Sequence, residues 1–187
     1  MTKTELRNYY KNLRNELTAE RIDELSLMIA NKALEIEIWD KEYYHIFLPI
    51  SIQKEVNTEY LLHVLQGKDK HVLLPKTNFE THVLSHFLLT DTTSIKNNKW
   101  GIPEPESGIE IQTDKIDVVF IPLLAFDTFG NRVGYGKGFY DTFLASCKAD
   151  VIKIGLSFFE ANEKITDLSP SDIPLDYCIT ASQVYEF

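Results

Sequence analysis

The segment from residue 116 to residue 147 limits the possible folds more than any other part of the chain. It opens with an apolar run rich in β-branched and aromatic residues, from Ile116 to Phe126. Such a run is typical of a strand that is buried on both faces of a parallel sheet. A glycine-rich loop follows, and from Phe139 to Cys147 apolar residues recur at helical spacing. Strand, loop and helix in this order predict a unit in which the amino terminus of the helix faces an anion.

The loop has the composition of a nucleotide site. Residues 130–141 read Gly-Asn-Arg-Val-Gly-Tyr-Gly-Lys-Gly-Phe-Tyr-Asp. Glycine lets a backbone approach a bulky ligand closely. Cations such as Arg132 and Lys137 suit a polyphosphate, and a carboxylate such as Asp141 suits the Mg²⁺ that accompanies it. The loop is not a Walker motif, because Lys137 is followed by Gly138 where serine or threonine is required. It is not a dinucleotide fingerprint either, because Phe139 stands where the third glycine would be. The alternative is a glycine-rich turn without a ligand.

Strand and helix patterns alternate along the chain. Helices are predicted at residues 2–17, 18–36 and 58–67, strands at 43–50, 71–74, 81–89, 151–156 and 177–180, and a long polar loop at 91–112. This alternation predicts an α/β fold with a mostly parallel sheet and helices on both faces, in three layers. The length predicts a single domain over residues 1–187. Ligands in such folds bind beyond the carboxyl ends of the strands, where the glycine loop is expected.

The bulk composition argues against several classes of protein. The net charge of −9 argues against broad nucleic-acid binding, which needs a basic surface. No window approaches the roughly 18 apolar residues of a membrane helix, and the charged N-terminus is unlike a signal peptide. Cys147 and Cys178 are far apart and no Cys-x-x-Cys occurs, which fits a reducing compartment. We expect a cytoplasmic monomer without membrane or nucleic-acid partners.

Basic residues recur along the first predicted helix, at Lys3, Arg7, Lys11 and Arg14. This spacing puts them on one helix face, while apolar residues on the neighbouring face would dock on the body of the protein. Thr2 and Glu5 are spaced for a capping box that starts the helix. The basic face is either a solvated surface or the contact to an anionic partner, and the spacing alone leaves both open.

Zinc chemistry and serine hydrolase chemistry lack their motifs. His82 and His86 lie four residues apart, but the residues between them do not complete a His-Glu-x-x-His motif, and their alternating pattern favours a strand. No Gly-x-Ser-x-Gly occurs. We therefore expect neither a zinc site nor a nucleophilic serine.

Several segments together resemble the 5-formyltetrahydrofolate cyclo-ligase family. In chain order they are Lys3-x-x-Leu6-Arg7, Gln53–Thr58, Trp100–Pro105, Ala125–Asp127, Gly130–Arg132, Gly134–Asp141 and Asp172–Asp176 followed by Thr180. The resemblance spans almost the whole chain. Two positions depart from the family pattern: Phe139, where tyrosine is commoner, and Asn57, where an acid is usual.

The resemblance implies a Mg²⁺-dependent ligase that uses ATP to turn 5-formyltetrahydrofolate into 5,10-methenyltetrahydrofolate. It implies that Arg132 and Lys137 clamp the transferred phosphoryl group. The implied ATP contacts are Lys3, Arg7, Gly134, Tyr135, Gly136, Lys137, Gly138, Phe139 and Tyr140. The implied contacts to the reduced folate are Glu55, Trp100 and Tyr140, and the implied Mg²⁺ ligands are Asp141 and Asp172.

Two other functions stay open. The first is a nucleotide-binding module that has lost the folate site, for which Asn57 is the hint. The second is a sugar-phosphate isomerase or acyl-CoA transferase on a similar α/β scaffold, which would not depend on ATP.

Overall fold

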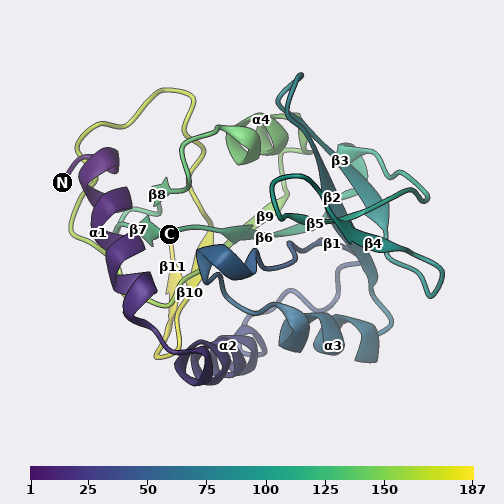
Figure 1. Cartoon of the computed structure of the whole chain (residues 1–187), viewed down its shortest axis with the longest axis horizontal. Coiled ribbons are helices and arrows are strands. Elements are labelled where there is room, and N and C mark those ends of the chain that lie inside the picture. The colour runs from purple at the N-terminus through teal and green to yellow at the C-terminus, as the bar shows by residue number, and fades with distance from the viewer.

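The structure is a computed structural model that describes residues 1–187. The helices are α1 (Lys3–Glu16), α2 (Ala19–Ala33), α3 (Glu59–Gly67) and α4 (Phe139–Ser146), with 3₁₀ turns at Ser51–Gln53 and Thr113–Lys115. The strands are β1 (Tyr43–His45), β2 (His71–Asn78), β3 (Val83–Leu88), β4 (Ile95–Asn97), β5 (Pro103–Pro105), β6 (Val118–Pro122), β7 (Ala125–Phe126), β8 (Arg132–Val133), β9 (Ile152–Leu156), β10 (Tyr177–Ile179) and β11 (Val184–Glu186). Figure 1 traces these elements from the N-terminus to the C-terminus.

Seven strands form one sheet in the order β11-β10-β9-β6-β1-β2-β3. The five inner strands run parallel to one another, and the two edge strands β3 and β11 are antiparallel to their neighbours. Two short hairpins, β4–β5 and β7–β8, stand outside this sheet. The prediction of an α/β fold with a mostly parallel sheet is confirmed.

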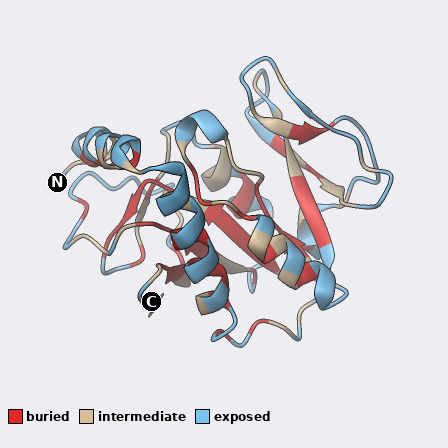
Figure 2. Cartoon of the chain, turned by 60° about the horizontal axis from the view of Figure 1, so that its bottom comes forward, coloured by how far each residue is buried: buried red, intermediate tan, exposed pale blue.

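Helices cover both faces of the sheet, which makes three layers (Figure 1). α2 and α3 pack on one face and α4 on the other. α1 lies beside the sheet and packs on the β7–β8 hairpin through Leu6 and Tyr10. Its predicted capping box is present, because Thr2 accepts a hydrogen bond from the Glu5 amide and Glu5 accepts one from the Thr2 amide. Figure 2 shows the buried residues on the strands and the exposed ones on the outer sides of the helices.

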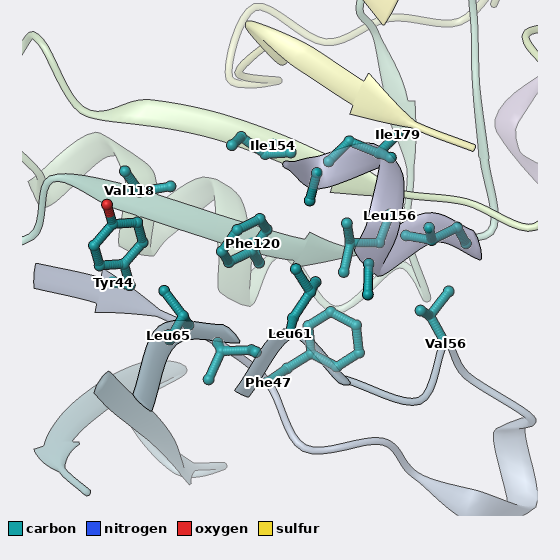
Figure 3. Close-up of a cluster of buried hydrophobic side chains, with 14 of the residues drawn as sticks. Tyr44, Phe47, Val56, Leu61, Leu65, Val118, Phe120, Ile154, Leu156 and Ile179 are labelled. Atoms are coloured by element: carbon teal, nitrogen blue, oxygen red, sulfur yellow. The ribbon is translucent and has the colours of Figure 1, made fainter. Parts of the chain in front are cut away.

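The central strand β6 explains why its sequence is apolar throughout. Val118 and Phe120 pack in the cluster under α2 and α3 (Figure 3), whereas Val119 and Ile121 pack toward α4. Successive side chains of a strand point to opposite faces, and both faces are covered here. Burying one such side chain contributes about 1.5–3 kcal/mol relative to its exposure. A continuous apolar run is therefore what this position in the sheet requires.

Two predicted strands are shorter in the structure. The apolar run 116–126 divides into β6, which ends at Pro122, and β7, which begins at Ala125. Proline has no N–H for a ladder, so the strand ends there. The segment 43–50 contributes only β1 to the sheet, since the chain then leaves toward the Ser51–Gln53 turn.

Four strands, β4, β5, β8 and β11, were missing from the sequence prediction. The predicted loop 91–112 contains the β4–β5 hairpin, in which every residue of β4 is exposed, so no apolar alternation marked it. The hairpin docks on β2, where Glu104 accepts a hydrogen bond from the Thr77 amide at 2.7 Å. The edge strand β11 follows β10 after a tight turn.

The sheet grows in two directions from its centre, and this positions the site. From β1 the chain continues through α3 to β2, and from β6 it continues through α4 to β9. The two crossover helices lie on opposite faces. Where neighbouring parallel strands send their crossovers to opposite sides, a crevice opens at their carboxyl ends.

Candidate functional site

A cleft of about 460 Å³ lies at the carboxyl ends of β1 and β6. Its walls are α1, the segment after β1, the β2–β3 and β4–β5 hairpins, and the glycine loop before α4. Every residue predicted for the site lines it: Lys3, Arg7, Glu55, Trp100, Arg132, Gly134, Tyr135, Gly136, Lys137, Gly138, Phe139, Tyr140, Asp141 and Asp172. Residues from across the whole sequence therefore share one surface. The ligand assigned to each of them remains a prediction.

The glycine loop packs against α1. Gly136 and Gly138 have φ values of +88° and +72°, which favour glycine. A side chain at Gly136 would also come within 3.3 Å of the Arg7 guanidinium carbon. Arg7 in turn donates a hydrogen bond from Nε to the carbonyl of Gly134 at 3.0 Å. The loop is held by α1 while its backbone stays open to the cleft.

The first part of the predicted loop serves the fold instead. Gly130 lies in the β7–β8 turn with φ +80°, and a Cβ there would lie 2.8 Å from the ring of Phe187. The buried Asp127 carboxylate accepts hydrogen bonds from the amides of Phe129, Asn131 and Ile165. Neither Gly130 nor Asp127 lines the cleft. The expectation that the nucleotide loop begins at residue 130 is therefore wrong, and its cleft-facing part begins at Arg132.

Two ion pairs cross the floor of the cleft. Arg132 pairs with Asp141 at 2.7 Å, and its side chain is 7% exposed. Lys3 pairs with Asp172 and so ties the start of α1 to the C-terminal segment. Burial opposes ionisation of Asp172, but hydrogen bonds from Lys3 and the Ser169 amide outweigh it and lower its pKa. Two carboxylates and two cations therefore lie together at this end of the cleft.

The two aspartates fit a magnesium ion that also binds phosphate oxygens. Asp141 uses Oδ1 for Arg132 and the Ile173 amide, and Asp172 uses Oδ2 for Lys3 and the Ser169 amide. One oxygen of each carboxylate thus has no partner within the protein. No group of three or more His, Cys, Asp or Glu residues is placed to hold a metal. Mg²⁺ commonly takes one or two carboxylates and completes its shell with phosphate and water, so this donor set fits it.

Three of the four basic residues of α1 line the cleft, and the fourth is buried. Lys3, Arg7 and Lys11 line the cleft. Arg14 is 3% exposed and donates to the carbonyl of Leu123 at 2.6 Å and to the hydroxyl of Tyr135 at 2.7 Å. Lys11 and Arg14 were not predicted as site residues. Their helical spacing with Lys3 and Arg7 was the signal that pointed to them.

The cleft is also lined by a buried carboxylate and by aromatic rings. Glu55 is 5% exposed and accepts a hydrogen bond from the Ile50 amide at 2.7 Å. Burial raises its pKa. Trp100, at the tip of the β4–β5 hairpin, is 55% exposed and lies 5.4 Å from the ring of Phe79. The Lys137 ammonium lies 5.0 Å from the Phe79 ring centre and 5.8 Å from that of Trp100. Phe79 was not predicted.

Asn57, the departure from the family pattern, lies outside the cleft lining. Its side-chain oxygen accepts a hydrogen bond from the Glu59 amide at 3.1 Å, at the start of α3. Asparagine and aspartate both serve well in this capping role. Thr58, at the N-cap position of α3, does not cap the helix with its side chain but donates from its hydroxyl to the carbonyl of Phe47. Asparagine at position 57 therefore preserves the hydrogen bond at the start of α3.

His82 and His86 do not come together. His82 lies in the β2–β3 turn beside Phe139, whereas His86 is buried on β3 beside Phe143. The expectation that no zinc site is present stays a prediction.

No helix is both long and apolar enough to traverse a bilayer.

Comparisons with known proteins agree with the geometry. The sequence profile described as the 5-formyltetrahydrofolate cyclo-ligase family matches residues 1–181. The 5-formyltetrahydrofolate cyclo-ligase of Haemophilus influenzae is 31% identical over 158 residues, which cover 82% of this chain and 84% of that protein. The mouse protein of the same description is 31% identical over 150 residues, covering 76% and 73%.

Solved structures agree as well. The 5,10-methenyltetrahydrofolate synthetase of Aquifex aeolicus superposes with a TM-score of 0.83 at 29% identity, over 100% of this chain and 93% of that one. The Mycoplasma pneumoniae synthetase has the same fold, with a TM-score of 0.76 at 23% identity. Because the family profile matches residues 1–181 of the 187, this chain belongs to the 5-formyltetrahydrofolate cyclo-ligase family.

Proposed function

We propose that the protein converts 5-formyltetrahydrofolate into 5,10-methenyltetrahydrofolate and splits ATP into ADP and phosphate in doing so. The observation that carries the proposal is that one cleft brings together two unlike sets of lining residues. The glycine loop and the cations of α1 form the first set, and the buried Glu55 with the aromatic rings of Phe79 and Trp100 forms the second. The first suits a polyphosphate and the second a pteridine ring.

The phosphates of ATP would lie between α1 and the glycine loop. Lys3 and Arg7 would contact them from the helix, and the backbone amides of residues 134–138 from the loop. The amino terminus of α4 follows at once, and its dipole contributes about 0.3–1 kcal/mol to binding an anion when exposed and up to about 2 when partly buried. What supports this is the set of cations that lines one side of the cleft.

The folate would contact the second set of lining residues. Glu55 would accept hydrogen bonds from the N–H groups of the pterin, and Trp100 would stack on its ring. Tyr140 also lines the cleft and would approach the reacting atoms. The position of Glu55 supports this, because its carboxyl group lines the cleft although the residue is buried. Pterin N–H groups would add to the hydrogen bond that the Ile50 amide already donates.

The chemistry follows from this arrangement. The formyl oxygen attacks the γ-phosphorus and ADP leaves. Nitrogen 10 then attacks the formyl carbon, and phosphate departs with the former formyl oxygen as the ring closes and a proton is released. Phosphorylation turns a poor leaving group into a good one. Positioning and charge neutralisation account for most of such catalysis, and Arg132 and Lys137 would supply them.

Magnesium would be held by Asp141 and Asp172. A bound Mg²⁺ neutralises phosphate oxygens and helps to orient them. We also propose that the chain acts as one domain and as a monomer in the cytoplasm. The two free thiols, Cys147 and Cys178, support a reducing compartment. Gel filtration tests the monomer.

The test is the absorbance of the methenyl product when the protein is mixed with 5-formyltetrahydrofolate, ATP and Mg²⁺. We expect product with ATP and none without it. Glu55→Gln keeps the shape of the side chain and removes its charge, so we expect it to raise the KM for folate by about 10-fold and to leave the Kd for ATP unchanged. ATP binding without product would favour a nucleotide-binding module. Turnover of another substrate without ATP would favour an isomerase or transferase.

A further inference from the structure

Two buried histidines lie behind the cleft, and neither was needed for the proposed binding of ATP or folate. His45 on β1 is 0% exposed and His86 on β3 is 1% exposed. Their Nδ1 atoms are 3.2 Å apart. Nε2 of His45 lies 3.1 Å from the hydroxyl oxygen of Tyr140, at the start of α4, and Tyr140 lines the cleft. A chain of hydrogen-bonding groups therefore runs from the core to the site.

The two imidazoles must share their protons in a defined way. Burial lowers the pKa of His45 well below its ordinary range and the pKa of His86 to about 4, so both rings are neutral at neutral pH. The ring of Phe143 packs against both imidazoles and makes their surroundings apolar. A neutral imidazole has one N–H and one acceptor nitrogen. The contact between the two Nδ1 atoms therefore needs a hydrogen on one Nδ1 and none on the other.

Two arrangements satisfy this contact. In the first, His45 carries its hydrogen on Nδ1, accepts at Nε2 from the hydroxyl of Tyr140, and leaves His86 with an N–H at Nε2. In the second, His86 carries its hydrogen on Nδ1, and His45 donates from Nε2 to the oxygen of Tyr140. The direction of the hydrogen bond to Tyr140 is opposite in the two arrangements.

The surroundings of His86 distinguish them. Its Nε2 is buried and has no hydrogen-bond partner. The first arrangement would put an unpaired N–H donor at this buried position, and such donors are rare in native proteins. The second arrangement leaves a bare nitrogen there. It is therefore the arrangement that the packing favours.

We infer that His45 and His86 are positioning residues that direct the hydroxyl proton of Tyr140 into the cleft. The oxygen of Tyr140 accepts from His45, and its own proton, which has no acceptor within the protein, is free to be donated to a bound substrate. The acceptors of matching chemistry are the phosphoryl oxygens of the nucleotide and the formyl oxygen of the folate. This inference rests on the proposed function for the identity of those substrates.

The tautomers can be measured directly in the unmodified protein. Long-range proton–nitrogen NMR spectra of the ¹⁵N-histidine-labelled chain report which ring nitrogen carries the hydrogen, and single His→Gln variants assign the signals. We expect His86 as the Nδ1–H tautomer and His45 as the Nε2–H tautomer. His45 as the Nδ1–H tautomer, or both rings as Nε2–H tautomers, would overturn the inference. This measurement needs no activity, so it stands apart from the test of the proposed function.

A double-mutant cycle tests the link to turnover. We expect His45→Leu to lower kcat/KM by about 10-fold in the wild-type background, as the loss of one oriented hydrogen bond implies. In the Tyr140→Phe background the same substitution should change kcat/KM by less than about 2-fold, because no hydroxyl is left to orient. His45→Gln, which retains an N–H near the position of Nε2, should restore most of the loss. Equal losses in both backgrounds would mean that His45 acts on the fold alone.

Tyr44→Phe is the matched control. Tyr44 is the buried neighbour of His45 on β1, but its hydroxyl donates to the carbonyl of Ile38 on the opposite face of the sheet. Its loss should lower the melting temperature and leave kcat/KM of the folded enzyme unchanged. A wild-type chain without turnover would refute the proposed function, whereas an active wild type without coupling between His45 and Tyr140 would refute this inference alone.

Discussion

At the scale of single residues, neighbours within one motif have different tasks. Gly130 and Gly136 both have positive φ values, but an added Cβ would meet Phe187, the residue after β11, in the first case and Arg7 of α1 in the second. Asp127 and Asp141 are both carboxylates of the motif. The first is fully buried among backbone amides, and the second faces the cleft. The same residue types therefore build the hairpin in one half and line the site in the other.

Arg132 is the residue whose loss tests the site most directly. We expect Arg132→Ala to lower kcat by roughly 10²–10³-fold, by analogy with the removal of a donor that stabilises transition-state charge. The fold should be retained, as judged by circular dichroism, because Asp141 remains partly exposed and can be hydrated.

The matched control is Arg21→Ala on α2. Arg21 pairs with Glu24, but both side chains are more than half exposed, at 51% and 60%. Its removal should leave turnover unchanged and affect stability by less than about 1 kcal/mol. Full activity of Arg132→Ala would remove Arg132 from the mechanism.

At the scale of elements, the β4–β5 hairpin meets the glycine loop across the mouth of the cleft. Lys137 from the loop lies over the rings of Phe79 and Trp100, at cation–π distance. Such a contact is worth about 0.5–1 kcal/mol at an exposed site, which is less than the attraction of an ammonium group to a polyphosphate in a shared cleft. Nucleotide binding should therefore draw Lys137 off the rings and free them for the folate.

This exchange predicts a fluorescence signal. The chain has two tryptophans, and Trp39 is removed by Trp39→Phe, so that Trp100 remains as the probe. We expect ADP with Mg²⁺ to change the Trp100 emission before any folate is added. In a further Lys137→Met variant, saturation with ADP should leave the emission unchanged. Calorimetric heat of ADP binding without any change in emission, in the protein that retains Lys137, would contradict the exchange.

At the scale of the whole molecule, the buried histidines make folding depend on pH. The pKa of His86 falls from 6.5 to about 4 on folding, because burial disfavours its charged form. Between these values the unfolded chain binds the proton and the folded chain does not, so stability is complete above pH 6.5 and is lost as the pH falls toward 4. Each pKa unit corresponds to about 1.4 kcal/mol, which makes the contribution of His86 roughly 3 kcal/mol.

Urea unfolding across this pH range measures the effect. We expect His86→Gln to reduce the loss of stability on acidification by an amount of that order. Glu55 acts in the opposite sense, because its raised pKa makes stability fall as the pH rises above 4.5. Glu55 is the same in both proteins, so the difference between the two pH profiles reports His86 together with its effect on the pKa of His45. Parallel profiles would show that His86 does not titrate on unfolding.

The sequence by itself determined the parts of this protein that follow from local periodicity and composition. The apolar alternation of β3, the continuous run of β6 and the capping box of α1 each carry their pattern in neighbouring residues, and the motifs of the family are local too. The polar β4 and the short β11 have no such pattern. They form by pairing with β5 and β10, and no pattern in their own residues marks them as strands.

Only the tertiary structure decided which residues meet. The hydrogen bond between Arg14 and Tyr135 joins two separate elements, and so do the contacts of His45 with His86 and with Tyr140. Each of these contacts depends on the crossover of strands and the packing of helices. Burial also changes the chemistry of a side chain, since it raises the pKa of Glu55 and lowers that of His86. Residue types are written in the sequence, whereas distances and desolvation, which set hydrogen bonds and charge states, arise when the chain folds.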